Sequence, residues 1–329
     1  MGYKIFTAGK KGIFDITPFC TGDIIISSFR EGKAGSIEFT VGRNLGGKFS
    51  FTEGDCVIFS IDDNILFKGF IFSKERNSDH FIKVTAYDQL RYLKNRNTYN
   101  YSFKTASEVV LMIIKDFGLD YAFIDNSQYV IGARIEENKS LFDIILNAAD
   151  ITYKNTGNRF ILFDKAGKLY FKNENNLKLP LSLSIADNSI IDFYSKTDID
   201  SDTFTQVKLF QKNKTKKIDK SIIIKSDEGI ENFGILQYFK KMPDEYNDFQ
   251  LKSCAENILK QKNRIKTTFC VKCLGRNNGE ENIRAGNGIF IDSLDIGEET
   301  INGFHFIDKC VHTFSSETHT IEMYFEKRR

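Results

Sequence analysis

Apolar and polar residues alternate along most of the chain from its start to about Asp88. The alternation has a period of two, is rich in β-branched and aromatic residues, and is broken by glycine turns, which is typical of β-strands. The strand-like stretches cover residues 22–32, 35–44, 54–64, 65–75 and 80–88. Leu90 and Leu93 then show helical spacing, which indicates a short closing helix. We therefore expect a compact β domain over residues 1–95.

The period of the pattern changes to that of helices between about Tyr99 and Asn175. Thr105 and Glu108 have the spacing of a capping box, and Gly118 lies where the cap at the end of a first helix belongs. A second helix is predicted from Ser140, and residues 159–173 read as a β-hairpin around a Lys-Ala-Gly turn. These features predict an α+β insertion domain of two helices and a hairpin over residues 96–180.

Strand patterns return from residue 181 and continue to the end of the chain. A helix opened by Pro243 is predicted over residues 243–264, with an apolar side that includes Leu251 and Ala255. The lysine-rich stretch 211–220 is read as a solvated hairpin tip. The fold class predicted for the whole chain is mostly β with α+β character, ending in a second β domain over 181–329 that carries the inserted helix.

The first and last domains show a loosely repeated pattern. Two sets of residues follow the same order and phase: Gly54, Val57, Phe59, Phe67, Gly69, Phe70, Phe72, Ile82 and Val84 in the first domain, and Gly286, Ile289, Ile291, Ile301, Gly303, Phe304, Phe306, Ile321 and Met323 in the last. Because any two β-hairpins match loosely, we treat internal duplication as a hypothesis.

Composition narrows the range of functions. The chain has 329 residues, 41% of them hydrophobic, and a formal net charge of +2. It is long enough for about two domains with real cores, and it lacks the basic field on which nucleic-acid binding depends. We expect no nucleic-acid recognition. No stretch reads as a signal peptide or a membrane span, so we expect a cytosolic product with no stable membrane insertion.

Three motifs imitate binding sites, and each fails on residue type or context. In Val41–Asp55, Gly42 and Gly47-Lys48 have phosphate-loop spacing, but Phe49 stands where Ser or Thr is needed and the context is strand-like. Cys270 and Cys273 form a CxxC on a strand, where residues three apart face opposite sides and no second pair completes a zinc site. The six scattered cysteines read as reduced thiols.

The third motif consists of Asp198, Asp200 and Asp202, which imitate the start of a calcium loop. Thr203 stands where a calcium loop has its glycine, and Leu209 stands where it has its last glutamate. We therefore interpret this stretch as a polar linker. Asp62 and Asp63 are read as turn residues.

The usual catalytic residues form no recognisable set. The four histidines are His80, His305, His312 and His319. The last three lie in one strand-rich region, where a spacing of seven would place successive members on opposite strand faces. No GxSxG elbow is present and nothing marks two acids as a pair. We expect no enzyme, no cofactor and no catalytic, cofactor-binding or metal-binding residue.

One long stretch, residues 54–99, resembles a known family, above all in "VTAYDQLRYLKN" at Val84–Asn95. Similarity continues in collinear order through "KTASEVV", "SLFDIILNAADITYKNTG", "FILFDKAGKLYFKN", "GILQYF" and "IRAGNGIFI". The family is the YqbQ/XkdQ-type, the baseplate hub proteins of contractile phage tails and of PBSX-like or R-type bacteriocin particles.

The resemblance implies two tail-tube-like β-barrel domains separated by the insertion. It implies a structural hub: a homotrimer whose six barrels form a pseudo-six-fold ring that adapts a six-fold tail tube to a three-fold spike. Implied partners are the tail tube or a tube-initiator protein, the spike, the tape-measure protein, and LysM-type and other baseplate proteins. The protein would be made in the bacterial cytoplasm and assembled into a particle released by lysis.

Two alternatives remain open at this point. One is a peptidoglycan hydrolase of the tail tip that uses carboxylates near Asp143 or Asp164. The other is a carbohydrate-binding tail module.

Overall fold

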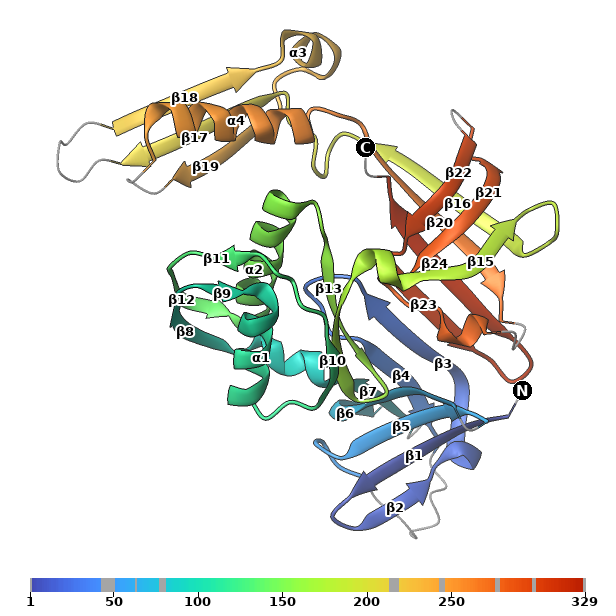
Figure 1. The fold of residues 1–329 in the computed structure, drawn as a ribbon. Helices are drawn as coiled ribbons and strands as arrows, with labels where there is room; N and C mark the ends of the chain where they lie inside the picture. The colour runs from blue at the N-terminus through green and yellow to red at the C-terminus, as the bar shows by residue number, and fades with distance from the viewer. Residues whose placement is uncertain are drawn as a thin grey trace. The chain divides into compact units, whose positions relative to one another are not determined.

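The computed structural model describes residues 2–42, 51–62, 64–76, 81–212, 219–242, 246–275, 279–297 and 300–327. Two compact units make up the chain (Figure 1). The first unit is Met1–Phe193 with Cys270–Phe325, and the second is Tyr194–Phe269 with Glu326–Arg329. Among the described residues no helix combines the length and the apolar character that crossing a membrane requires.

A large sheet dominates the first unit, and it holds strands from both ends of the sequence. The described part of the sheet has the strand order β16-β20-β24-β23-β3-β4-β7-β6-β5-β1-β2. Its strands are β1 (Tyr3–Gly9), β2 (Gly12–Asp15), β3 (Cys20–Phe29), β4 (Ser36–Val41), β5 (Cys56–Ile61), β6 (Asn64–Arg76), β7 (Ile82–Tyr87), β16 (Ile190–Asp198), β20 (Lys266–Leu274), β23 (Lys309–Phe314) and β24 (His319–Glu326). The chain leaves the first unit within β16 and returns within β20.

The amino-terminal strands form the hydrophobic core that their alternation predicts. In β4, Ile37, Phe39 and Val41 are buried, and Phe314 of β23 joins the same core. Strand β3 pairs antiparallel with β23, with Ile26 opposite His312. The carboxy-terminal strands therefore complete the β layer that the amino-terminal strands begin.

The strand order of the large sheet contains two similar blocks. In the first block, β3, β4, β7 and β6 lie side by side. In the second block, β16, β20, β24 and β23 do so. In both blocks the last two strands are adjacent in reverse of their sequence order. The second unit is inserted between β16 and β20, where the first block has only a short link between β3 and β4.

Two hairpins also begin in the same way. Gly54 and Gly286 both have φ of +89°, in the left-handed region that glycine tolerates. The Gly54 N–H donates to Ile71 O at 2.8 Å, as the Gly286 N–H does to Ile307 O. These matches support the hypothesis of internal duplication. The domain division 1–95, 96–180 and 181–329 stays a prediction.

The middle of the chain forms helices and small sheets with a core of their own. Its elements are β8 (Arg96–Tyr101), β9 (Lys104–Thr105), α1 (Ala106–Asp116), β10 (Tyr121–Ile124), β11 (Val130–Ile131), β12 (Arg134–Ser140), α2 (Leu141–Thr156), β13 (Phe160–Lys165) and β14 (Lys168–Asn173). Thr105 and Glu108 form the predicted capping box, and Ser140 caps α2. Strands β13 and β14 pair antiparallel as the predicted hairpin.

A separate three-stranded sheet of the first unit has the strand order β15-β21-β22. These strands are β15 (Lys178–Ser184), β21 (Gly288–Asp295) and β22 (Thr300–Phe306), and the short 3-10 helices are η1 (Thr17–Phe19), η2 (Gln89–Lys94), η3 (Glu174–Leu177) and η4 (Glu280–Asn282).

The second unit is a three-stranded sheet with helices. Its elements are β17 (Gln206–Lys212), β18 (Asp219–Lys225), α3 (Asp227–Phe233), β19 (Gln237–Met242) and α4 (Asp248–Lys262). Helix α4 lies within the predicted helix 243–264 and is capped by Asn247, while Pro243 lies outside the described residues. The fold as a whole is mostly β with α+β parts, which confirms the predicted fold class.

Candidate functional site

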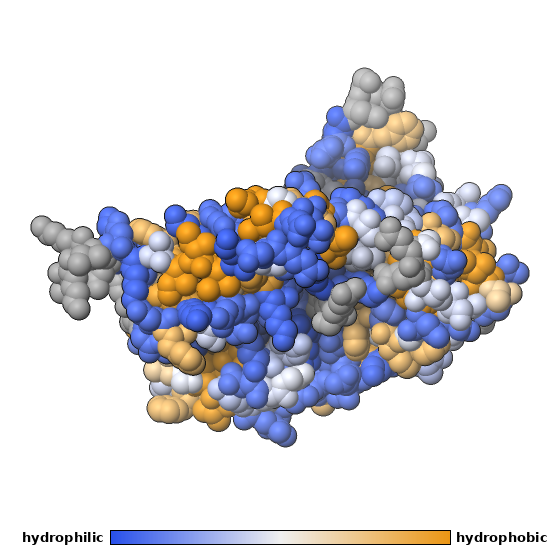
Figure 2. Space-filling model, turned by 90° about the horizontal axis from the view of Figure 1, so that it is seen from above, coloured by the Kyte–Doolittle hydropathy of each residue, from blue (hydrophilic) through white to orange (hydrophobic). Residues whose placement is uncertain are grey.

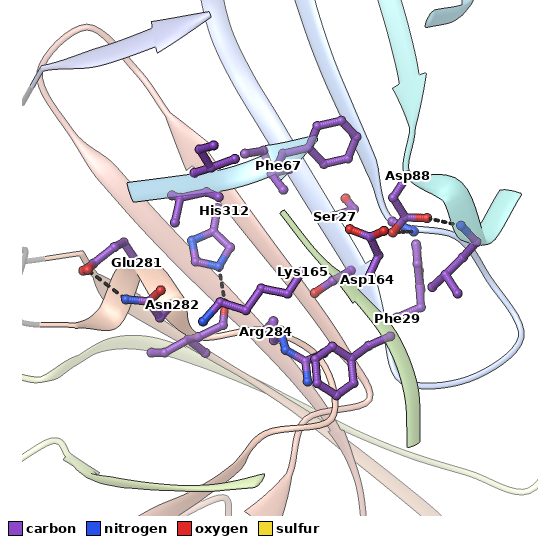
Figure 3. A pocket seen from close by; sticks show the side chains of 18 residues that line it. Ser27, Phe29, Phe67, Asp88, Asp164, Lys165, Glu281, Asn282, Arg284 and His312 are labelled. Atoms are coloured by element: carbon purple, nitrogen blue, oxygen red, sulfur yellow. Dashed lines mark hydrogen bonds between the residues drawn. The ribbon is translucent and has the colours of Figure 1, made fainter. Parts of the chain in front are cut away.

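The first unit contains a small cavity, lined by both apolar and charged side chains, where its amino-terminal, middle and carboxy-terminal segments meet (Figure 3). Its volume is about 80 Å³. The polar and charged side chains that line it are Ser27, Ser28, Asp88, Asp164, Lys165, Glu281, Asn282, Arg284 and His312. They come from β3, the start of η2, the β13–β14 hairpin, η4 and the segment after it, and β23.

Asp88 is held at the cavity wall as the N-cap of η2. Its carboxylate accepts the Leu90 N–H at 3.0 Å and the Gly35 N–H at 2.9 Å. A Cβ at Gly35 would lie 2.6 Å from Asp88 Oδ2, so this close approach requires glycine. Burial, and secondly the charge of Asp164, raise the pKa of Asp88 well above its usual range.

Asp164 reaches the same cavity from the end of β13. It accepts hydrogen bonds from Gln89 Nε2 at 3.0 Å and from the Gly167 N–H at 2.8 Å. Burial raises the pKa of Asp164 to about 6, although these hydrogen bonds oppose the shift. Figure 3 shows the Asp88 and Asp164 carboxyl groups turned toward each other.

The Gln89 side chain connects η2 to the β13–β14 hairpin through hydrogen bonds. Its Nε2 also donates to Asp120 O and to Gly167 O, both at 2.9 Å, while its Oε1 accepts the Asp120 N–H at 3.0 Å. A buried amide with this many partners fixes the position of the β13–β14 turn.

Arg284 supplies the positive charge of the cavity. Its guanidinium carbon lies 3.1 Å from the centre of the Phe163 ring, and its Nη1 donates to Ala285 O at 3.1 Å. Its Nη2 is buried with no hydrogen-bond partner among the described residues. Burial lowers the pKa of Arg284 to about 9, against the attraction of Asp164, so the group is still charged at neutral pH.

Two histidines form a buried pair beside the cavity. His312 Nε2 lies 2.6 Å from Ile283 O and must donate its proton there, so its Nδ1 accepts. His319 Nε2, 2.9 Å from that Nδ1, is then the donor. Burial lowers the pKa of His312 to about 4 and that of His319 to about 3, the latter also because of His312. Both rings are therefore neutral at pH 7.

The histidine pair corrects a sequence expectation. The spacing of seven predicts that His312 and His319 lie on opposite faces of a strand. The turn between β23 and β24 reverses the chain, so that the two residues lie on neighbouring strands, with Phe314 opposite His319. His80 lies outside the described residues.

A second buried charge cluster joins the same three segments. Arg30 pairs with Glu174 and, through Nη1, with Asp308 Oδ1 at 3.2 Å. Its backbone N–H also donates to Asp308 O at 2.9 Å. Arg159 lies 3.9 Å from Glu174 Oε2 and 3.2 Å from Glu31 Oε1. The cluster therefore connects β3 to η3 and to the strand that follows β22.

The geometry suits a structural junction better than a binding cleft. Pockets for sugars and other small ligands usually measure about 300–1,000 Å³, whereas 80 Å³ holds only a few water molecules. Asp143 is not among the lining residues; it accepts the Ser140 Oγ–H at the start of α2. Of the two positions that the hydrolase alternative names, Asp143 or Asp164, only Asp164 lies at this cavity. Asp164 lies with Asp88 instead, a residue that no sequence motif singled out.

The motifs rejected in the sequence can be placed where the structure describes them. Gly47, Lys48 and Phe49 lie outside the described residues, and the described ends of that stretch lead from β4 and into β5. Cys270 and Cys273 are buried in β20. Asp198 accepts the N–H groups of Asp200 and Ser201, as a polar turn does. Asp62 has φ of 50° in the β5–β6 turn, while Asp63 lies outside the described residues. Within the described ranges no three His, Cys, Asp or Glu side chains are grouped to hold a metal ion.

Exposed apolar residues also occur away from the cavity. Figure 2 shows them on one face as separate patches bordered by hydrophilic residues. Strand β16 carries three such side chains, Ile191, Phe193 and Tyr194, with Tyr194 exposed to 60%.

Solved structures share the fold over nearly the whole chain. A 43 kDa tail protein of prophage MuSo2 from Shewanella oneidensis aligns with a TM-score of 0.70 and 11% identity over 98% of both chains. A tail protein from Neisseria meningitidis aligns with a TM-score of 0.67 and 14% identity, over 99% of this chain and 97% of that one. A type VI secretion component from E. coli, described as similar to the phage T4 tail proteins gp27 and gp5, gives a TM-score of 0.54 at 9% identity over 94% of this chain and 73% of that one.

Two relatives from Bacillus subtilis match at the level of sequence. YqbQ, described as uncharacterised, is 30% identical over 276 residues, 83% of this chain and 81% of its own length. The protein XkdQ of the phage-like element PBSX is 28% identical over 292 residues, 87% of this chain and 86% of its own. A family model described as YqbQ-like matches residues 24–326. The resemblance drawn from the sequence is thus confirmed, and the chain belongs to the YqbQ-like family.

Proposed function

We propose that this chain is the baseplate hub of a contractile phage tail or a tail-like injection particle. Three copies form a ring that adapts the six-fold tail tube to the three-fold spike. The tube or a tube-initiator protein, the spike, the tape-measure protein and LysM-type baseplate proteins are its proposed neighbours. Family membership and the fold shared with phage tail proteins support a structural role in a tail.

The repeated strand order is the observation that supports the proposed ring of three chains. The blocks β3-β4-β7-β6 and β16-β20-β24-β23 meet through the β3–β23 pair inside one chain. If the blocks are equivalent, the same kind of pair forms between chains, with β16 of one copy beside Phe72–Arg76 in the next, the residues of β6 that extend past its pairing with β5. Three chains with two blocks each then supply six equivalent positions.

Strand β16 has the properties of such an edge. It is nine residues long and is the end strand of this sheet over the described residues, so one of its edges faces no other strand of the sheet. Ile191, Phe193 and Tyr194 are exposed to 45%, 37% and 60%. An apolar edge strand of this length favours pairing with a second chain over exposure to water.

The test is the mass of the purified chain, alone and with its tube and spike proteins. We expect a species near three times 37.8 kDa, or a ring that contains three copies. The variant Ile191→Asp/Tyr194→Asp should abolish it, because the charges would meet the neighbouring strand. The control Ile135→Asp changes a side chain exposed to 70% in β12 and should leave the assembly intact. A monomer that persists in the presence of both neighbours would refute the hub.

The cavity does not favour the hydrolase alternative, because its volume of about 80 Å³ is too small for a sugar ring between Asp88 and Asp164. Incubation of the chain with peptidoglycan in a zymogram provides the check, and clear lysis would reverse this preference.

A further inference from the structure

Within the second unit, the described residues cover one face of the sheet. Its strand order is β18-β17-β19, and α4 packs on β17 and β18. Val207 and Leu209 of β17 are buried in the core that α4 closes with Leu251 and Ala255. Because side chains alternate along a strand, the residues between them lie on the opposite, open face.

The strand register defines this open face. Lys208 lies opposite Ile223 of β18 and Phe239 of β19, and Phe210 lies opposite Ser221 and Lys241. Phe239 is exposed to 56% and Ile223 to 49%. The Phe210 and Phe239 rings are stacked with their centres 6.2 Å apart. The middle of the open face is therefore an apolar surface in contact with water.

Lysines lie around this apolar centre, and Lys208 lies within it, between Ile223 and Phe239. The register places Lys208, Lys212, Lys225 and Lys241 on the open face, with Asp219 as the acid opposite Lys212. Lys225 is 3.4 Å from Asp227, whereas the other three lysines take part in no ion pair among the described residues. The face thus combines an apolar centre with a positive rim.

We propose that this open face docks an acidic protein surface of another subunit of the assembled particle. The partner surface has apolar residues at its centre and Asp or Glu side chains at its rim, because opposite charge favours encounter and fixes register. The proposal rests on the proposed function, since it requires an assembled particle.

Charge and size disfavour the other occupants. A second copy of the same face would bring lysines against lysines, which is repulsive. With strands about 4.8 Å apart and about 3.3 Å per residue, the face covers roughly 300 Å², below the roughly 800 Å² per partner of a stable two-protein complex. It is therefore suited to one contact among several in an assembly. A branched Ile223 beside Phe239 is a poorer platform for stacked bases than aromatic residues alone.

The first experiment follows incorporation into particles made in the host. The variant Lys208→Glu/Lys241→Glu reverses the rim, and Lys240→Glu/Lys260→Glu is the control with the same change in net charge. Lys240 lies on the other face of β19, and Lys260 is on α4. We expect at least tenfold less of the rim variant in purified particles and no change for the control, with equal melting temperatures of both purified chains.

The outcomes separate the two proposals. If the wild-type chain is absent from particles, the proposed function fails. If the wild-type and rim-variant chains are incorporated equally, the docking surface is overturned while the hub stands.

The second experiment identifies the occupant. The photo-crosslinking residue p-benzoylphenylalanine replaces Phe239, and in a control chain it replaces Phe249, which is exposed to 81% on α4. A crosslink from position 239, and none from 249, to a peptide of another subunit rich in Asp and Glu supports the proposal. A crosslink to a second copy of this chain, to nucleic acid or to lipid, or no crosslink at all, overturns it.

Discussion

At the scale of single residues, His312 and His319 couple stability to pH. Their folded-state pKa values of about 4 and about 3 lie below the ordinary value of 6.5. The unfolded chain therefore binds more protons than the folded chain between these values, so this contribution to stability is lost as pH falls below 6.5. Asp164, raised from 3.8 to about 6, acts in the opposite sense: its contribution is lost as pH rises from 3.8 to about 6.

The first prediction concerns His319→Gln. The Gln amide can donate to His312 Nδ1 as His319 Nε2 does, but it does not titrate. Between pH 6.5 and 4 we expect the variant to lose less stability than wild type, by up to about one proton in the slope of the free energy of unfolding against pH. Urea unfolding at several pH values measures this, and the Asp164 effect cancels in the difference. Identical slopes would contradict the assignment; His305→Gln serves as control.

Gly69 is the second single-residue test. A Cβ at this position would lie 2.3 Å from Tyr87 O, where β6 and β7 approach closely. Gly69→Ala should lower the free energy of unfolding by about 1–3 kcal/mol, because backbone has to move. At Gly132 no atom lies within 4 Å of such a Cβ, so Gly132→Ala should change stability by less than about 1 kcal/mol. Thermal melting compares the two, and equal effects would count against this packing.

At the scale of elements, the cap of α1 makes a local contribution. Thr105 Oγ1 accepts the Glu108 N–H, and Glu108 Oε2 accepts the Thr105 N–H at 2.7 Å. Thr105→Ala should cost about 1 kcal/mol and speed hydrogen exchange in the first turn of α1. The nearby exposed Ser102→Ala is the control and should leave exchange unchanged. Unaltered exchange in Thr105→Ala would show that tertiary packing alone holds the turn.

Local patterns explain why these elements were predictable. Capping residues, alternation in β4 and the Lys-Ala-Gly turn act within a few residues, so the sequence predicts α1, α2 and the β13–β14 hairpin. The pairing of β3 with β23 depends on residues far apart in the chain, and no local propensity encodes it. The same holds for the meeting of Asp88, Asp164 and Arg284. The histidine pair was missed because the turn between β23 and β24 was not recognised within one strand-rich region.

At the scale of the whole first unit, Arg30 stabilises the junction of three segments. Its side chain is 4% exposed and contacts Glu174 and Asp308. Arg30→Met would remove the closest cation from Glu174, whose side chain is 12% exposed and whose next cation, Arg159, lies at 3.9 Å, so the change should cost about 3 kcal/mol. Lys154→Ala breaks an exposed pair with Asp150 and should cost about 0.5 kcal/mol or less. Urea midpoints measure both, and similar small losses would mean that the cluster is not coupled to global unfolding.

The β3–β23 pair has a consequence for biosynthesis. Arg30 and Asp308, at the ends of these strands, are 278 residues apart. While the ribosome is still translating, β3 has no partner on that side, and closing so large a loop makes the late step slow. A nascent or truncated polypeptide therefore exposes the unpaired edge of β3 until its last strands have been synthesised, and such an edge favours aggregation.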